Sequence, residues 1–139
     1  MQPIPGTEKE YFCDTLILSV GLIPENELSL AAGVLLDGRS RGAVVDENHQ
    51  TTIPGIFAAG NVLQVHDLVD FVSMEAEELA DSAARYLKEE GLPECALAVE
   101  TDGNVTHTIP QKISGEADFN LSMRVRRPRK SCTIRLSRG

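Results

Sequence analysis

Apolar residues along this chain form short runs separated by glycine and proline, followed by one long stretch with helical spacing. A near-continuous apolar run occupies residues 14–20 and ends at Gly21. Such a run is typical of a strand buried on both faces, as in a parallel sheet. Further short strands are predicted at residues 35–38, 43–46 and 56–59. The first half of the chain is therefore predicted to be a layer of short strands.

The longest regular pattern extends from about Asp70 to Glu90. Glycine and proline follow it at positions 91 and 93, which are typical stop signals of a helix. A shorter helix is predicted after Pro24. In the long helix, apolar residues recur every three or four positions and form one stripe, made of Val72, Ala76, Leu79, Ala80, Ala83 and Leu87.

The last third of the chain has a different pattern. Residues 93–118 are predicted to be a connector with short strands at 96–99 and 105–109. Residues 119–125 and 132–136 alternate between apolar and polar positions, which predicts two strands paired as a β-hairpin with one apolar face. An isolated hairpin is marginally stable in water, so this one is expected to need a partner surface.

Together these elements predict an α/β fold. Residues 1–92 are expected to form part of a domain, with short strands and one long helix. Residues 93–118 connect it to a β-hairpin extension, which is expected to be a truncated β module, at residues 119–139. A length of 139 residues is enough for one modest domain with a small addition.

Charge is distributed unevenly along the chain. Residues 1–100 carry 5 Lys and Arg against 18 Asp and Glu, whereas residues 101–139 carry 8 against 3. This change of sign indicates a change of module. The basic run at residues 124–130 raises the possibility of nucleic-acid binding. The acidic body and the scarcity of aromatic residues instead favour a charged sheet edge that resists pairing, so no nucleic-acid partner is expected.

The sequence predicts no membrane segment, no signal peptide, no redox cysteine pair and no metal site. No apolar run reaches the roughly 18 residues needed to cross a membrane, and no signal peptide precedes residue 13, so a cytoplasmic protein without membrane contact is expected. Cysteines 13, 95 and 132 lie far apart and form no C-x-x-C pair. The histidines are equally scattered, and no metal site or catalytic residue is predicted.

The segment around Gly60 carries the best candidate chemistry. An apolar strand ends at Gly60, where the absence of a side chain lets the backbone approach a ligand. Asn61 offers an amide oxygen and an amide nitrogen. The helix start near residues 70–73 offers unpaired N–H groups that favour an electron-rich oxygen. From these residues alone, an ordinary strand–loop–helix unit with a glycine turn is the favoured interpretation.

Residues 51–61, from Thr51-Thr52 to Ala59-Gly60-Asn61, resemble the second FAD-contacting motif of the pyridine nucleotide–disulfide oxidoreductase family. That motif has a Thr, an apolar strand and then Ala-x-Gly-Asp, and Asn61 stands where Asp is usual. Residues 13–26 are similar to the family's strand and Gly-x-x-Pro-Asn crossover. The resemblance covers roughly residues 12–90.

The resemblance implies a flavin role for particular residues. The residue at position 61 would bind a ribityl hydroxyl, which an amide oxygen also accepts, though more weakly. N–H groups around Val72 and Ser73 would face the pyrimidine edge of the flavin. The implied cofactors are FAD in the intact protein and NAD(P)H as its co-substrate, and the implied cofactor-binding residues are Gly60, Asn61, Val62, Asp70, Phe71, Val72 and Ser73.

The sequence contains no G-x-G-x-x-G, so the pyrophosphate of FAD has no cradle here. By resemblance, we expect this chain to be the C-terminal portion of an FAD-dependent NAD(P)H oxidoreductase, inactive and without tightly held FAD when alone. Its expected partner is a missing N-terminal FAD and NAD(P) region, and self-association is expected to cover apolar strand surface otherwise. The alternative is an independent, non-catalytic binding or assembly module that keeps the fold.

Overall fold

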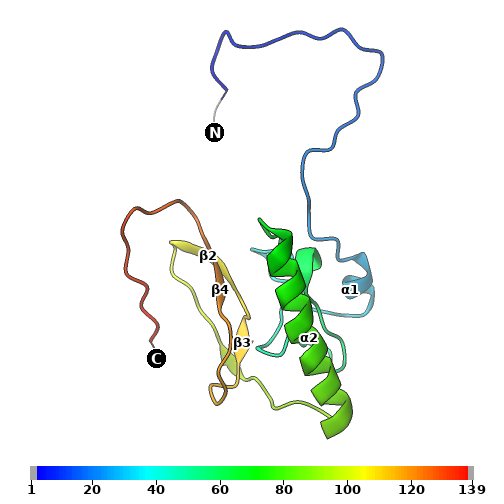
Figure 1. The fold of residues 1–139 in the computed structure, drawn as a ribbon, viewed down its shortest axis with the longest axis vertical. Coiled ribbons are helices and arrows are strands. Elements are labelled where there is room, and N and C mark those ends of the chain that lie inside the picture. The colour runs from blue at the N-terminus through cyan, green and yellow to red at the C-terminus, as the bar shows by residue number, and fades with distance from the viewer. Residues whose placement is uncertain (1–2, 138–139) are drawn as a thin grey trace.

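The computed structural model describes residues 3–137, which contain two α-helices, one 3-10 helix and four short strands (Figure 1). The pairs β1–β3 and β2–β4 form two separate antiparallel sheets. These short strands and the long helix make a partial α/β domain, as the sequence predicts. In chain order the elements are α1 (Glu27–Ala31), η1 (Gly60–Val62), α2 (Val69–Glu89), β1 (Leu97–Ala98), β2 (Val105–Ile109), β3 (Lys112–Ile113) and β4 (Ser122–Val125).

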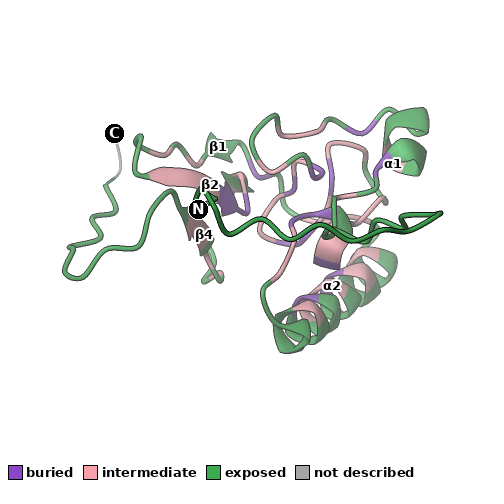
Figure 2. Cartoon of the chain, turned by 90° about the horizontal axis from the view of Figure 1, so that it is seen from above, coloured by how far each residue is buried: buried purple, intermediate pink, exposed green. Residues whose placement is uncertain are grey.

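The core lies between α2 and the β2–β4 sheet, and most of it comes from the looped segment that joins α1 to η1 (Figure 2). Leu63 and Val45 are its largest fully buried side chains. Only one core residue, Ile109, comes from a strand. The buried apolar cluster consists of Val34, Ala43, Val45, Ala58, Leu63 and Ile109.

The looped segment replaces three of the predicted strands. Residues 35–38, 43–46 and 56–59 form isolated bridges and no continuous strand. The antiparallel bridges pair Leu36 with Ala43, Val45 with Thr51, and Gln50 with Phe57, and Asp46 forms a parallel bridge with Lys112. Each of these segments is therefore extended and makes single bridges. The turns between the segments leave too few aligned residues for the consecutive bridges of a β-strand.

The prediction of a long helix is confirmed by α2, whose bounds agree with it to within about one residue. The predicted stripe is only partly covered, because Ala76, Ala80 and Leu87 are exposed. The buried residues of α2 are instead Glu75 and Ser82. The helix thus presents much of its apolar surface to solvent.

The strand predicted at residues 14–20 is wrong for this structure. The segment has no assigned strand, and Leu16, Ile17 and Val20 are 73%, 88% and 88% exposed. An inner strand of a parallel sheet obtains its hydrogen bonds and its burial from neighbours on both sides. Within residues 3–137, no strand pairs with this segment.

The predicted pairing of the C-terminal hairpin is also wrong. β4 confirms a strand within residues 119–125, but its partner is β2, with Val105 opposite Val125 and Ile109 opposite Ser122. Residues 132–136 are exposed and have no strand. β2 offers an apolar, buried end at Ile109, and the distal segment offers no comparable contact. The division at residues 92 and 118 stays a prediction.

Within residues 3–137, no helix has the length and apolar character that crossing a membrane requires.

Candidate functional site

The glycine turn and the long helix meet directly. Gly60 is buried and has a φ of +73°, a left-handed conformation that side chains rarely adopt. A Cβ at this position would lie 3.2 Å from Cγ1 of Val72. The Gly60 N–H donates a hydrogen bond of 2.5 Å to Oε2 of Glu75. Glycine is therefore required both by the backbone conformation and by the approach of α2.

Glu75 joins three parts of the chain. Its side chain is 8% exposed, and the same oxygen that accepts the Gly60 N–H lies 3.1 Å from Nε2 of His66. His66 is also largely buried, with a side chain 9% exposed. A buried carboxylate needs such partners, since an unpaired one is strongly destabilising. Glu75 thus fixes the start of the 60–66 loop against the second turn of α2.

The loop after Gly60 is closed by the side chain of Asn61. Its Oδ1 accepts the His66 N–H at 3.2 Å. The backbone carbonyl of Val62 accepts a bond of 2.7 Å from Nδ2 of Asn26. An amide oxygen has two lone pairs, so Asn61 can accept one further hydrogen bond.

The first turn of α2 is open. Its N-cap, Leu68, makes no side-chain capping bond, and Val69 is 74% exposed. In a helix that begins at Val69, the carbonyl of Leu68 takes the first intrahelical bond, from the N–H of Val72. The free N–H groups are therefore those of residues 68–71. The sequence-based prediction placed the free N–H groups around Val72 and Ser73, which is about one turn later in the helix than the structure has them.

The structure brings only part of the predicted site together. Gly60 and Val72 are in contact, Phe71 is half-exposed, and Asp70 and Ser73 point away from the core as exposed residues. These positions do not test cofactor binding, which stays a prediction for all seven residues.

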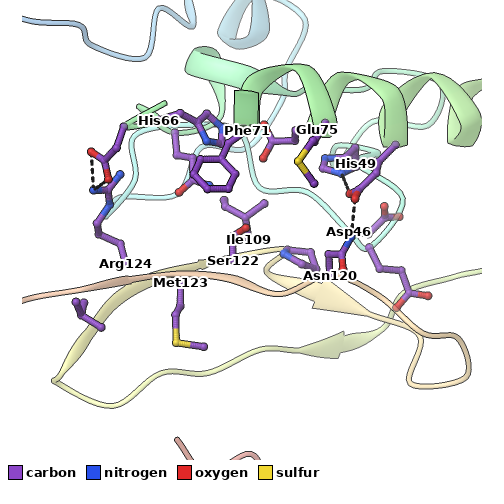
Figure 3. Close-up of a pocket in the computed structure, with 17 residues that line it drawn as sticks. Asp46, His49, His66, Phe71, Glu75, Ile109, Asn120, Ser122, Met123 and Arg124 are labelled. Carbon is purple, nitrogen blue, oxygen red and sulfur yellow. Dashed lines mark hydrogen bonds and ion pairs between the residues drawn. The ribbon is translucent and has the colours of Figure 1, made fainter. Parts of the chain in front are cut away.

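A cavity of about 510 Å³ lies beside this turn, between α2 and the β2–β4 sheet (Figure 3). Phe71 of α2 and Ile109 of β2 face it from opposite sides. Met74 and Pro110 add apolar surface. Of the seven predicted site residues, only Phe71 lines this cavity.

Carboxylates predominate among the charged groups of the cavity, namely Asp46, Glu47, Asp67, Glu75 and Glu78. Glu78 lies 3.4 Å from Nε2 of His49 and accepts a 2.5 Å hydrogen bond from Asn120. The cation Arg124 pairs with Asp67 at 3.0 Å. Burial raises the pKa of Asp46 above its ordinary value, and the charge of Glu47 acts in the same direction. Removal from water therefore opposes further negative charge here.

The sequence alone did not identify two residues of this site, His66 and Glu75. His66 lies beside Asp67 in the chain, yet it pairs with Glu75, and Asp67 pairs with Arg124. The sequence does contain a sign that Glu75 is buried. Glu75 lies three residues after Val72 and four before Leu79, so it falls on the predicted apolar stripe. An acid in that position indicates a buried, paired carboxylate. Among residues 3–137, no group of three or more His, Cys, Asp or Glu is arranged to hold a metal ion.

Cys95 is expected to react far more slowly with thiol reagents than Cys13 and Cys132. Cys95 is buried, and its thiol pKa is raised to about 11, first by burial and then by the charges of Asp46 and Glu47. The other two cysteines are exposed. The thiolate is the reacting form, so at pH 8 only about one molecule in a thousand presents it. Iodoacetamide labelling followed by mass spectrometry measures the three rates separately.

The labelling rate of Cys95 is expected to rise about tenfold per pH unit between pH 7 and 10, because the thiolate fraction rises by that factor below the pKa. Equal labelling of all three cysteines in the folded protein at pH 7 would contradict the buried position of Cys95. Labelling in urea provides the control, since all three thiols are then exposed.

The family model described as pyridine nucleotide-disulphide oxidoreductase matches residues 2–91. A probable ferredoxin reductase of Castellaniella defragrans is 42% identical over 57 residues, which cover 41% of this chain and 13% of the relative. The mitochondrial dihydrolipoyl dehydrogenase of Caenorhabditis elegans is 42% identical over 60 residues, which cover 42% of this chain and 12% of the relative. A ferredoxin–NADP reductase of Leuconostoc mesenteroides is 30% identical over 76 residues, covering 52% of this chain and 23% of the relative.

The matched segments thus span between about an eighth and a quarter of these three relatives. No solved structure gives a significant match.

Proposed function

This chain belongs to the pyridine nucleotide-disulphide oxidoreductase family, and we propose that it supplies the ribityl and pyrimidine side of an FAD site in an NAD(P)H oxidoreductase. When bound, FAD takes up hydride from the nicotinamide and passes the electrons to an acceptor. The contribution of this chain is to hold and orient the flavin. No residue of the chain is proposed as an acid, a base or a nucleophile.

The observation that carries this proposal is the contact between the Gly60 turn and the open first turn of α2. The left-handed Gly60 lets the turn pack directly against Val72, where a Cβ would intrude, and so brings the backbone after Gly60 beside the start of α2. Next to it, the uncapped helix offers N–H groups and the positive end of its dipole. Reduced flavin carries negative charge at its pyrimidine edge, which such a helix end would stabilise.

Within this proposal, each part of the turn has its own task. The second lone pair of Asn61 Oδ1 would accept a ribityl hydroxyl while the first holds the His66 N–H. The N–H groups of residues 69–71 would face the pyrimidine oxygen. Val72 would act indirectly, by packing against Gly60. Glu75 would keep the two walls at a fixed separation through the Gly60 N–H.

We further propose that another polypeptide segment completes the site and covers the exposed apolar residues at 14–23. That segment would carry the pyrophosphate cradle, which this sequence lacks. In its absence, the same surface would be covered by self-association through apolar contacts. Such contacts are strengthened by salts that favour burial, which distinguishes them from charged contacts.

A chimera tests the flavin role directly. Residues 12–90 of this chain would replace the equivalent segment of a flavoprotein relative. We expect the purified chimera to be yellow, and we expect Gly60→Ala to reduce its retained flavin at least about tenfold, because a new Cβ would press on Val72 in a strained backbone conformation. Flavin absorbance per mole of protein is the measurement.

The matched control in the same chimera is Gly38→Ala, which adds a methyl group where nothing lies within 4 Å. A chimera that folds, by circular dichroism, but stays colourless would overturn the proposed flavin contact. The chain alone is expected to stay colourless after FAD is added and removed by gel filtration, because its sequence has no pyrophosphate cradle.

A further inference from the structure

The segment that follows β4 is a basic tail with no assigned helix or strand. Residues 126–137 are all exposed and contain no acidic residue. Among the described residues, none of the tail's basic side chains forms a salt bridge, and only Arg129 makes a side-chain hydrogen bond, to Asn104. Its basic residues are Arg126, Arg127, Arg129, Lys130 and Arg135. The tail therefore carries positive charge that the described part of its own chain leaves unpaired.

The cavity beside α2 has the opposite character. Five carboxylates line it, and Arg124, the only Lys or Arg among its described lining residues, is already paired with Asp67. The Glu78 side chain is 41% exposed, and its ring partner is Nε2 of His49 at 3.4 Å. His49 is nine-tenths buried, and its Nδ1 atom has no hydrogen-bond partner among the described residues. This cavity, which we call the acidic cleft, therefore has more carboxylates than its described Lys and Arg side chains can neutralise.

The acidic cleft also has apolar surface that solvent reaches. Phe71 and Met74 are 52% and 56% exposed. The tail carries matching apolar residues, since Ile134 and Leu136 are 65% and 75% exposed. Charge and apolar surface are thus complementary between two parts of one chain.

The tail does not cover the cleft of its own chain in this structure. Both views place it on the far side of the β2–β4 sheet from α2 (Figures 1 and 2). A second copy has the same tail and the same cleft, so the tail of each copy can bind the cleft of the other in one symmetric contact.

We propose that the basic tail of one copy docks in the acidic cleft of a second copy. Arginine side chains of the tail pair with Glu78 and its neighbouring carboxylates, and Ile134 and Leu136 lie against Phe71 and Met74. This contact uses a different surface from the apolar segment at residues 14–23. It shares Phe71 with the proposed flavin site, and its tests use the chain without flavin.

Salt is the first test, because contacts between exposed charges weaken when the Debye length falls below the separation of the charges. Sedimentation equilibrium of the full chain at 50 mM and 500 mM NaCl measures the dimer dissociation constant. We expect it to rise about tenfold or more with salt, as several charge pairs are screened. Association through residues 14–23 alone would keep its affinity or strengthen.

Two double variants locate the contact on the tail. Arg126→Gln with Arg127→Gln removes two tail charges, and we expect it to weaken the dimer at 50 mM NaCl about tenfold. Lys9→Gln with Lys88→Gln removes the same net charge from exposed positions outside the tail. That control is expected to change the dissociation constant less than about twofold.

A second pair of variants locates the contact on the cleft. Glu78→Gln removes a cleft charge but keeps an oxygen that can accept the bond from Asn120. Glu77→Gln removes the same charge from the neighbouring exposed position. We expect only the Glu78 variant to weaken the dimer. Glu78→Lys is expected to weaken the dimer more than Glu78→Gln, because it adds a charge that repels the tail.

Three results would overturn the proposal. The first is a monomer at all concentrations at 50 mM NaCl, which would also result if each tail folded back on its own cleft. The second is a dimer with the same affinity in the Arg126 and Arg127 variant as in the control. The third is tail-dependent association found only when nucleic acid co-purifies, detected by absorbance at 260 nm.

Discussion

Replacing Gly42 with alanine is expected to lower the free energy of unfolding by about 3 kcal/mol or more. A Cβ at this position would lie 1.7 Å from the carbonyl oxygen of Leu63 and 2.7 Å from its Cα. Leu63 is fully buried, and the atoms in conflict belong to its backbone, so no side-chain rotation relieves the overlap. The Gly42 carbonyl also accepts the Asp37 N–H at 2.8 Å, which holds the turn in place.

The matched control for this change is Gly38→Ala in the same turn. Nothing lies within 4 Å of a Cβ at Gly38, and its φ is not in the left-handed region. Its effect is expected to stay within about 0.5 kcal/mol, since exposed substitutions without strain cost little. Urea unfolding followed by circular dichroism measures both variants. Equal stabilities of the two variants would show that the close approach of residue 42 to Leu63 does not exist in solution.

The position of Gly42 also shows what the sequence does not reveal. Its neighbour Leu63 is 21 residues away in the chain, and no local pattern relates the two. Glycine in a turn-rich segment is ordinarily read as a source of backbone freedom. Here the requirement is steric and tertiary, and it depends on how the loop after η1 packs over the 37–42 turn.

Elements determined by local pattern were predicted well. α2 follows from three- and four-residue spacing with stop residues after it, and β2 follows from five residues of strand-forming character. Segments whose structure depends on partners were not predicted well. Residues 14–20 have a buried-strand composition, but no strand within residues 3–137 lies beside them. β4 pairs with β2 and not with residues 132–136. Pairing is a non-local choice that alternation alone does not encode.

The candidate site follows the same division. The Gly60 turn and the helix after it were expected to lie together, and they do. No role of its own was predicted for Glu75 from the sequence, and it lies close to two further acids, Glu77 and Glu78. Their side chains differ in burial because successive helical positions are about 100° apart. Only Glu75 turns inward toward the Gly60 N–H and His66.

Glu75→Ala is therefore expected to destabilise the fold by about 2–4 kcal/mol. The change leaves the buried Gly60 N–H and the largely buried His66 ring without their shared acceptor. Amide hydrogen exchange at Gly60 is the most direct measurement, and its protection is expected to fall together with the global stability measured in urea.

Two further variants separate the hydrogen bonds from the charge and from the helix itself. Glu75→Gln keeps a carbonyl oxygen for the Gly60 N–H, so it is expected to cost less than Glu75→Ala. Glu77→Ala makes the same truncation at an exposed position two residues later, and its effect is expected within about 0.5 kcal/mol. If Glu75→Ala matched Glu77→Ala, the carboxylate would not join the turn to the helix. The two walls proposed to hold the flavin would then lack the contact that sets their separation.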